Sequence, residues 1–205
     1  MKSTFLTMFV AAYSTTLAGA SDQTGAGALQ IQVYDYANIE QVALDRLLSS
    51  THEILATAGI PVQVSLCRGQ GAVSCESAEP QTQPLVVRIV PGYAKTSSNA
   101  RREPLGQSYA GHDGGSVASI FLAPAREQAA AVNVPWLTVL SYAAAHEIGH
   151  LLLGDQAHTS RGVMKAHWDR ADYMAMSQNQ CHFTNEQARI LAARFGAPAI
   201  ARNAK

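Results

Sequence analysis

Along much of the chain, apolar residues recur with a period of two or with the period of a helix, and this pattern predicts where strands and helices form. Residues 29–34 alternate apolar and polar positions, which is typical of a strand with one buried face. Apolar residues at helical spacing predict an amphipathic helix over residues 39–58 that ends at Gly59. Shorter apolar runs predict four more strands, over residues 60–66, 85–90, 105–110 and 117–123.

The last third of the chain has two helical patterns. The most apolar helix is predicted over about residues 135–153, with Gly154 at its end. A last helix begins at Thr184, where Thr184 and Gln187 fit a capping box, and it stops at Gly196. The expected order is strand, helix, four strands and two helices. Without internal repeats or a domain linker, this order predicts a single α+β domain.

Residues 1–20 are expected to stand apart from that domain. Lys2 precedes a short apolar stretch that ends in small residues at an A-x-A site, which is typical of a secretory signal peptide cut after Ala20. The stretch is too short and too interrupted by hydroxyl residues to span a bilayer comfortably. We therefore expect residues 21–205 to be the mature domain, secreted or periplasmic, with no stable membrane insertion after cleavage.

Composition narrows the classes of function. The 205 residues include 15 Lys or Arg and 15 Asp or Glu, so the formal net charge is zero. With 47% hydrophobic and 15% charged residues, the chain can form a core and is too apolar to be disordered. The absence of a dense basic run argues against nucleic acid as the main partner. The length suits one domain, and we expect a monomer.

The spacing of the three cysteines is consistent with a protein that is exported from the cytoplasm. Cys67 and Cys75 enclose a short loop rich in turn-forming residues, so a disulfide between them is the pairing that this loop favours in an oxidising compartment. Cys181 would then be left over. Three pairings are possible among three cysteines, so the spacing leaves the pairing open. None of the three lies in C-x-x-C spacing, which argues against a cysteine zinc site.

The strongest chemical signal is an H-E-x-x-H motif inside the apolar helix, with His146, Glu147 and His150 as its defining residues. Residues four apart lie on one helical face, so both imidazoles can bind a single metal ion. Glu147 is rotated by about 100° from His146, near enough to hold a metal-bound water without binding the metal itself. Shuffling a chain of this composition gives such a motif only about 0.01 times, so the signal is specific.

A catalytic zinc site takes three protein ligands and a water, so a third ligand is needed. We expect it to be His158, because Gly154 ends the helix and lets the chain turn back to present a ligand from a loop. Glu186, on the last helix, and Asp155 are the alternatives. The residues around Met164 could form a turn that places this side chain beneath the metal.

These residues resemble the metzincin pattern of zinc peptidases, in which an extended histidine motif is followed by a Met-turn. The spacing departs from it, because both gaps, from His150 to Gly154 and from there to His158, are four residues rather than three, and Gln156 occupies the usual third-ligand position. The stretch 146–168 is closer to a group of uncharacterised bacterial secreted zincin-like proteins with this longer spacing.

The resemblance implies a small zincin fold, which is a twisted mixed five-stranded sheet with an active-site helix and a C-terminal helix. Residues 105–110 would be the antiparallel edge strand against which an extended substrate lies. Metzincins often have a Tyr two residues after the turn Met, but Ala166 stands there. The residue that stabilises the transition state is therefore unassigned. Tyr173 and His167 are candidates, although a surface position after the turn is the favoured interpretation of His167.

The function that the resemblance implies is that of a secreted zinc-dependent peptidase. Its Zn2+ would be held by His146, His150 and His158, Glu147 would be the general base, and its partner would be a peptide or protein substrate. Two alternatives stay open. One is a gluzincin-type peptidase, because Glu186 follows an Asn as the third ligand does in that group. The other is a zinc-binding zincin-like protein without peptidase turnover.

Overall fold

The computed structural model describes residues 27–67, 75, 84–92, 104–110 and 116–195, and the expected signal peptide lies outside these ranges. In chain order its elements are β1 (Leu29–Asp35), α1 (Gln41–Ala56), β2 (Val62–Cys67), β3 (Leu85–Val90), β4 (Gly106–Ala110), β5 (Ser116–Phe121), α2 (Leu122–Val132), α3 (Trp136–Leu153), α4 (Arg170–Ser177) and α5 (Asn185–Arg194).

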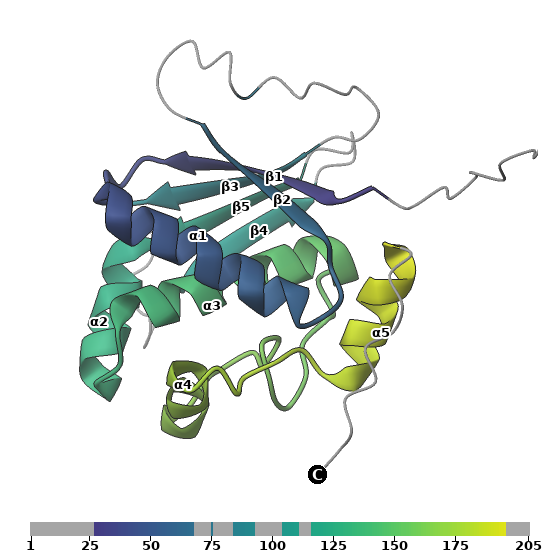
Figure 1. The fold of residues 1–205 in the computed structure, drawn as a ribbon. Coiled ribbons are helices and arrows are strands. Elements are labelled where there is room, and N and C mark those ends of the chain that lie inside the picture. The colour runs from purple at the N-terminus through teal and green to yellow at the C-terminus, as the bar shows by residue number, and fades with distance from the viewer. Residues whose placement is uncertain (1–26, 68–74, 76–83, 93–103, 111–115, 196–205) are drawn as a thin grey trace, which may run out of the picture.

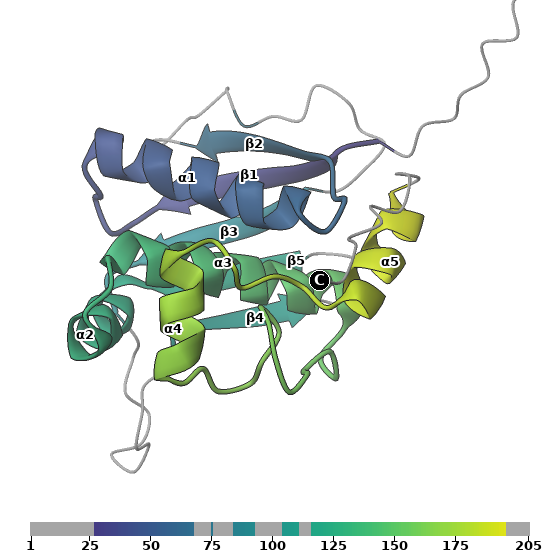
Figure 2. The ribbon, with the colours of Figure 1, turned by 60° about the horizontal axis from the view of Figure 1, so that its bottom comes forward.

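The strands form one five-stranded sheet in the order β2-β1-β3-β5-β4 (Figure 1). Neighbouring strands are parallel from β2 to β5, and β4 pairs antiparallel with β5 at the end of the sheet. This is the mixed sheet expected of a small zincin fold, and the strand predicted over residues 105–110 is its antiparallel edge. Helices α1 and α3 lie on the same face of the sheet (Figures 1 and 2).

The period of two in the strands has a direct structural cause. Alternate residues point to opposite faces, and the buried set on each strand is apolar. This face packs on apolar side chains of α1 and α3 to form the core, and burial of each Leu or Ile contributes about 1.5–3 kcal/mol. Central members of the core are Ile31, Val33, Val87, Ile89 and Ile120 from the sheet and Leu44, Leu47, Leu140 and Ile148 from the helices.

The predicted helix ends also have identifiable causes. Gly59 follows α1 with a φ of 76°, and Gly154 follows α3 with a φ of 92°, a conformation that only glycine adopts without strain. The capping box of α5 is present as predicted, because the Thr184 hydroxyl accepts from the Gln187 backbone while the Gln187 side chain accepts from the Thr184 backbone. The predicted stop at Gly196 lies outside the described residues.

Two helices were missed by the sequence pattern. The apolar run predicted as a strand over residues 117–123 is strand only to Phe121, and α2 begins at Leu122. An apolar strand that continues directly into a helix gives no break in hydropathy, so the pattern concealed the change. Pro124 lies in the first turn of α2, where proline is tolerated, and Asn133 ends the helix with a φ of 58°.

The second missed helix, α4, is only eight residues long. Its signal was local, because Asp169 and Asp172 form a capping box at its N-terminus. In the described part of the chain, four helices therefore follow β5, where the sequence pattern predicted two. Both additional helices contribute to the lining of the cavity described below.

The cysteine pairing is the one that the short loop between Cys67 and Cys75 favours. Cys67 and Cys75 form a disulfide, and Cys181 is free and buried. Within the described ranges, no helix has the length and apolar character needed to cross a bilayer.

Candidate metal centre

Helix α3 carries the predicted motif through the interior of the protein. Nearly every residue from Val139 to Gly149 is buried, and the helix packs on β4, β5, α1 and α2. The backbone N–H of Gly154 donates to the carbonyl of His150 at 2.8 Å, and the chain then leaves the helix axis. The two motif histidines thus lie near the C-terminal end of a helix that is fixed on several sides.

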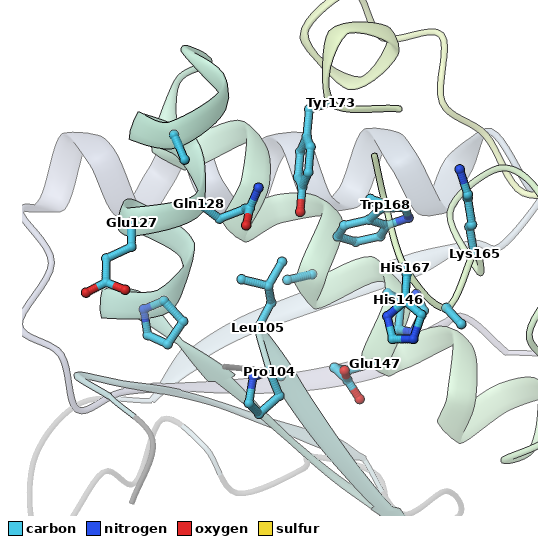
Figure 3. Close-up of a pocket in the computed structure, with 15 residues that line it drawn as sticks. Pro104, Leu105, Glu127, Gln128, His146, Glu147, Lys165, His167, Trp168 and Tyr173 are labelled. Atoms are coloured by element: carbon cyan, nitrogen blue, oxygen red, sulfur yellow. The ribbon is translucent and has the colours of Figure 1, made fainter. Parts of the chain in front are cut away.

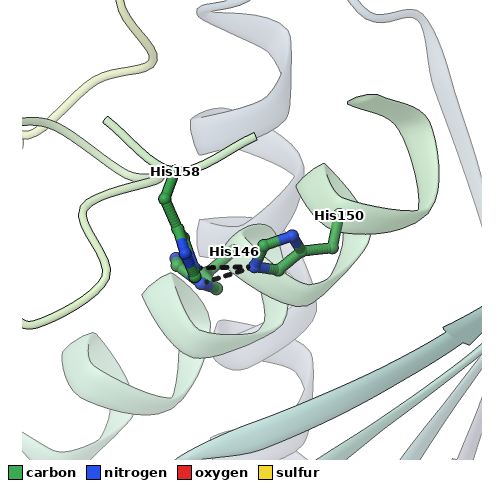
Figure 4. A group of neighbouring side chains, drawn as sticks. All are labelled: His146, His150 and His158. Carbon is green, nitrogen blue, oxygen red and sulfur yellow. Dashed lines mark hydrogen bonds between the residues drawn. The ribbon is translucent and has the colours of Figure 1, made fainter. Parts of the chain in front are cut away.

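Three histidines converge beside this helix end (Figure 4). Nε2 of His150 lies 3.1 Å from Nε2 of His146 and 3.0 Å from Nε2 of His158. In a tetrahedral site with Zn–N bonds of about 2.0–2.1 Å, two ligand nitrogens lie about 3.3 Å apart. Among the described residues these three histidines are the group whose ligand atoms are close enough to hold one metal ion. Their spacing fits a three-histidine zinc site.

The two helix histidines also have the orientation that metal binding requires. Nδ1 of His146 is 2.8 Å from the carbonyl oxygen of Val163, and Nδ1 of His150 is 3.3 Å from that of Gly154. A carbonyl can only accept a hydrogen bond, so Nδ1 carries the proton in each ring and Nε2 is left with a lone pair. Burial lowers the pKa of His146 to about 4, so this ring is neutral at physiological pH.

The third histidine comes from the loop that follows α3, as predicted. The backbone of Thr159, next to His158, donates to the carbonyl of Met164 at 2.9 Å and forms a bridge with Lys165. A turn closes this loop, because the N–H of Lys165 donates to the carbonyl of Gly162 at 3.1 Å. His158 and the turn are therefore held together through backbone hydrogen bonds.

Two glycines permit this close packing. Gly162 has a φ of 80°, and a Cβ there would overlap the backbone carbonyl of His182. A Cβ on Gly149 would overlap the side chain of Met164, which is fully buried. Met164 thus packs against α3 at Gly149, one residue before His150.

Glu147 lies beside the three histidines and is not one of the converging groups. Its side chain is 8% exposed and points toward β4, where it meets Gly106 and Ser108. Burial raises the pKa of Glu147, while a hydrogen bond from the Ser108 hydroxyl and the nearby His150 act in the opposite direction. A buried carboxylate one position from a metal ligand can serve as a proton acceptor.

A cavity of about 610 Å³ opens beside His146 and Glu147 (Figure 3), a volume within the range of small-molecule sites. It is bounded by β4 and the residues before it, by α2 and α3, by the segment after the Met164 turn, and by α4. Its lining includes Pro104, Leu105, Gly106, Pro124, Glu127, Gln128, Ala131, Ala143, Lys165, Ala166, His167, Trp168 and Tyr173.

Both residues named above as candidates for stabilising the transition state, His167 and Tyr173, line this cavity. His167 is exposed, as its interpretation as a surface residue requires, yet it also lines the cavity. Tyr173 is buried, and its phenolic oxygen points into the cavity in Figure 3. The wall that α2 supplies, including Glu127 and Gln128, could not be found from the sequence, because that helix was not predicted.

The alternative third ligands lie elsewhere. Glu186 is on the surface of α5, where its carboxylate pairs with Arg189 at 2.6 Å. Asp155 is exposed after the end of α3. Neither belongs to the group of converging ligand atoms in the described part of the chain.

No family model matches this sequence, and no curated protein matches it either. Among solved structures, the archaemetzincin of Methanopyrus kandleri is similar at 14% sequence identity, over 82% of this chain and 96% of that chain, with a TM-score of 0.49. At this level of similarity, the chemistry of this chain has to be inferred from its own residues.

Proposed function

We propose that this chain is a metzincin-like zinc metallopeptidase, in which His146, His150 and His158 hold the metal and Glu147 is the general base. The observation that carries the proposal is the convergence of three Nε2 atoms next to a buried carboxylate that is not itself part of the cluster. A purely structural zinc site needs no such carboxylate. Bound zinc would lower the pKa of a water toward about 7 and polarise the scissile carbonyl.

The protein's own part in the reaction is proton transfer and orientation. The carboxylate of Glu147 accepts a proton from the attacking water and passes it to the nitrogen of the leaving amine. The backbone acceptors at Val163 and Gly154 keep Nδ1 of the helix histidines protonated, so that both rings present Nε2.

Substrate would bind along β4. No described strand pairs with the outer edge of β4, so its backbone groups are available to an extended peptide in the β-addition mode. Gln107 and Tyr109 are exposed on this strand, while Gly106 and Ser108 are partly buried toward α3. A peptide on this edge would pass Glu147 and could place one side chain in the cavity.

We place His167 and Tyr173 as the candidates for stabilising the transition state. Both line the cavity that contains Glu147, and His167 lies close enough to His158 for the two rings to interact electrostatically.

Secretion remains part of the proposal. It is supported by the signal-like pattern of residues 1–20 and by the Cys67–Cys75 disulfide, a bond that persists mainly in oxidising compartments.

The test is digestion of a broad peptide library by the zinc-loaded chain at neutral pH, with the Glu147→Gln variant as control. We expect cleavage by the wild type and a loss of about 10²–10⁴-fold in the variant, with its zinc content unchanged. If the variant cleaved as fast as the wild type, the base would have to be assigned elsewhere. If the wild type bound zinc and cleaved nothing, the zinc-binding protein without turnover would be favoured.

A further inference from the structure

The edge strand β4 contacts Glu147 through two alternate residues. Residues two apart on a strand share one face, and Gly106 and Ser108 pair with Ile120 and Ala118, which are buried on the helix side of the sheet. A Cβ on Gly106 would lie 2.6 Å from Cγ and 2.9 Å from Oε1 of Glu147. The Ser108 hydroxyl donates a hydrogen bond to the same carboxylate. The side chain of Glu147 is therefore held between β4 and its own helix.

We propose that Ser108 is a positioning residue, which fixes the orientation of the Glu147 carboxylate beside His146 while Gly106 leaves room for it. The inference rests on the proposed function in that Glu147 is taken as the base. A glutamate has several rotatable bonds, and small errors in the placement of a reacting group are costly, since about 1 Å can reduce a rate by about 100-fold. One hydrogen bond and close packing remove much of that freedom.

The same strand would then serve two purposes. The outer edge of β4 is the proposed binding site for substrate backbone, and its inner face holds the group that accepts the proton. Substrate and base are thereby aligned by a single element of five residues, Gly106–Ala110. Glu147 is only 8% exposed, so its carboxylate needs a hydrogen-bond donor in place of the water that it has lost. The hydroxyl of the half-buried Ser108 supplies that donor.

The contact can be measured without any activity, by a double-mutant cycle in the zinc-free chain. Ser108→Ala should lower the midpoint of chemical denaturation, and it should lower it much less when Glu147→Ala is also present. Ser119→Ala, at another half-buried serine on the neighbouring strand β5, is the matched control and should shift the midpoint equally in both backgrounds. Equal shifts for Ser108→Ala in both backgrounds would overturn the proposal.

A kinetic experiment then tests positioning. Ser108→Ala should lower kcat by about 10- to 100-fold with KM and zinc content unchanged, and it should have no further effect in the Glu147→Gln background. Ser108→Thr keeps the hydroxyl and should retain most of kcat, whereas Gly106→Ala should displace the carboxylate and lower kcat. An unchanged kcat for Ser108→Ala, or a Ser108→Thr variant that folds and binds zinc yet is as slow as Ser108→Ala, would contradict the assignment.

The two proposals fail in different ways. If the wild type cleaves no peptide, the proposed function is wrong, but the denaturation cycle still decides whether Ser108 holds Glu147. If the wild type cleaves and the cycle shows no coupling, the peptidase stands and Ser108 has no positioning role.

Discussion

Nδ1 of His146 donates a hydrogen bond of 2.8 Å to the backbone carbonyl of Val163, which joins the first residue of the helical motif to the turn that follows the third histidine. The acceptor is a main-chain atom, so it depends on the conformation of the turn rather than on the identity of one side chain. Partners of this kind fix the tautomer and orientation of metal-binding imidazoles. In this protein, the orientation of the His146 ring therefore depends on a segment outside α3.

The identity of the third ligand can be tested by comparing two variants. His158→Ala removes one of three converging nitrogens and should weaken zinc binding by more than about 100-fold, because substitutions beyond the ligand shell alone cost 10- to 100-fold. Glu186→Ala should leave the affinity nearly unchanged, since this carboxylate is paired with Arg189 on the surface. Competition with a chromophoric chelator measures both affinities, and the reverse order would favour the gluzincin-type site.

Gly149 should be intolerant of even a methyl group. Alanine would raise helix propensity by about 1 kcal/mol, but overpacking of a core costs about 1–3 kcal/mol, and the side chain of Met164 is fully buried where the new Cβ would lie. We expect the net effect of Gly149→Ala to be a free energy of unfolding lowered by up to about 2 kcal/mol in urea denaturation. Gly92→Ala is the control, because a Cβ there has no atom within 4 Å. A stabilised Gly149→Ala variant would refute the contact.

The free thiol of Cys181 should make the fold sensitive to alkaline pH. Burial raises its pKa from 9.0 to about 12, with a smaller contribution from Asp172, so the native thiol keeps its proton after the unfolded thiol has lost it. The resulting stability is fully present below the ordinary thiol pKa of 9.0 and is lost as the pH rises toward 12. Free energies of unfolding at pH 8 to 11 should therefore decline.

Cys181→Ala is the control for this decline, and its slope with pH should be smaller even if the variant is less stable overall. Some slope should persist above pH 10, because burial also raises the pKa of the neighbouring Tyr142. Identical slopes for the two proteins would show that Cys181 does not titrate in this range.

Removal of the disulfide should lower stability and leave the proposed metal site intact. Cys67 and Cys75 are eight positions apart in sequence, and closure of a loop this short is worth about 2–3 kcal/mol on chain-entropy arithmetic. The double variant Cys67→Ser, Cys75→Ser should be less stable by that amount in guanidinium denaturation. Its zinc content should not change, because β2 and β4 are at opposite edges of the sheet. Loss of zinc in a folded variant would contradict this separation.

Features that depend on neighbouring residues were predictable. The alternation in β1 indicated a strand with one buried face, and the glycines Gly59 and Gly154 indicated helix ends, where both have a positive φ. Thr184 and Gln187 indicated the capping box of the last helix. The failures also have local causes. The apolar run after residue 117 contains no boundary between β5 and α2, and α4 is so short that its capping aspartates were its main signal.

The sequence by itself determined that His146 and His150 share one helical face with Glu147 beside them, because helical geometry sets the positions of residues three or four apart. Only the tertiary structure decided the rest of the site. His158 joins the pair because the chain folds back after Gly154, and Ser108 meets Glu147 because β4 packs on α3. Such contacts depend on how separate elements pack, so the sequence favoured His158 while leaving Glu186 open as a third ligand, and it gave no sign of Ser108.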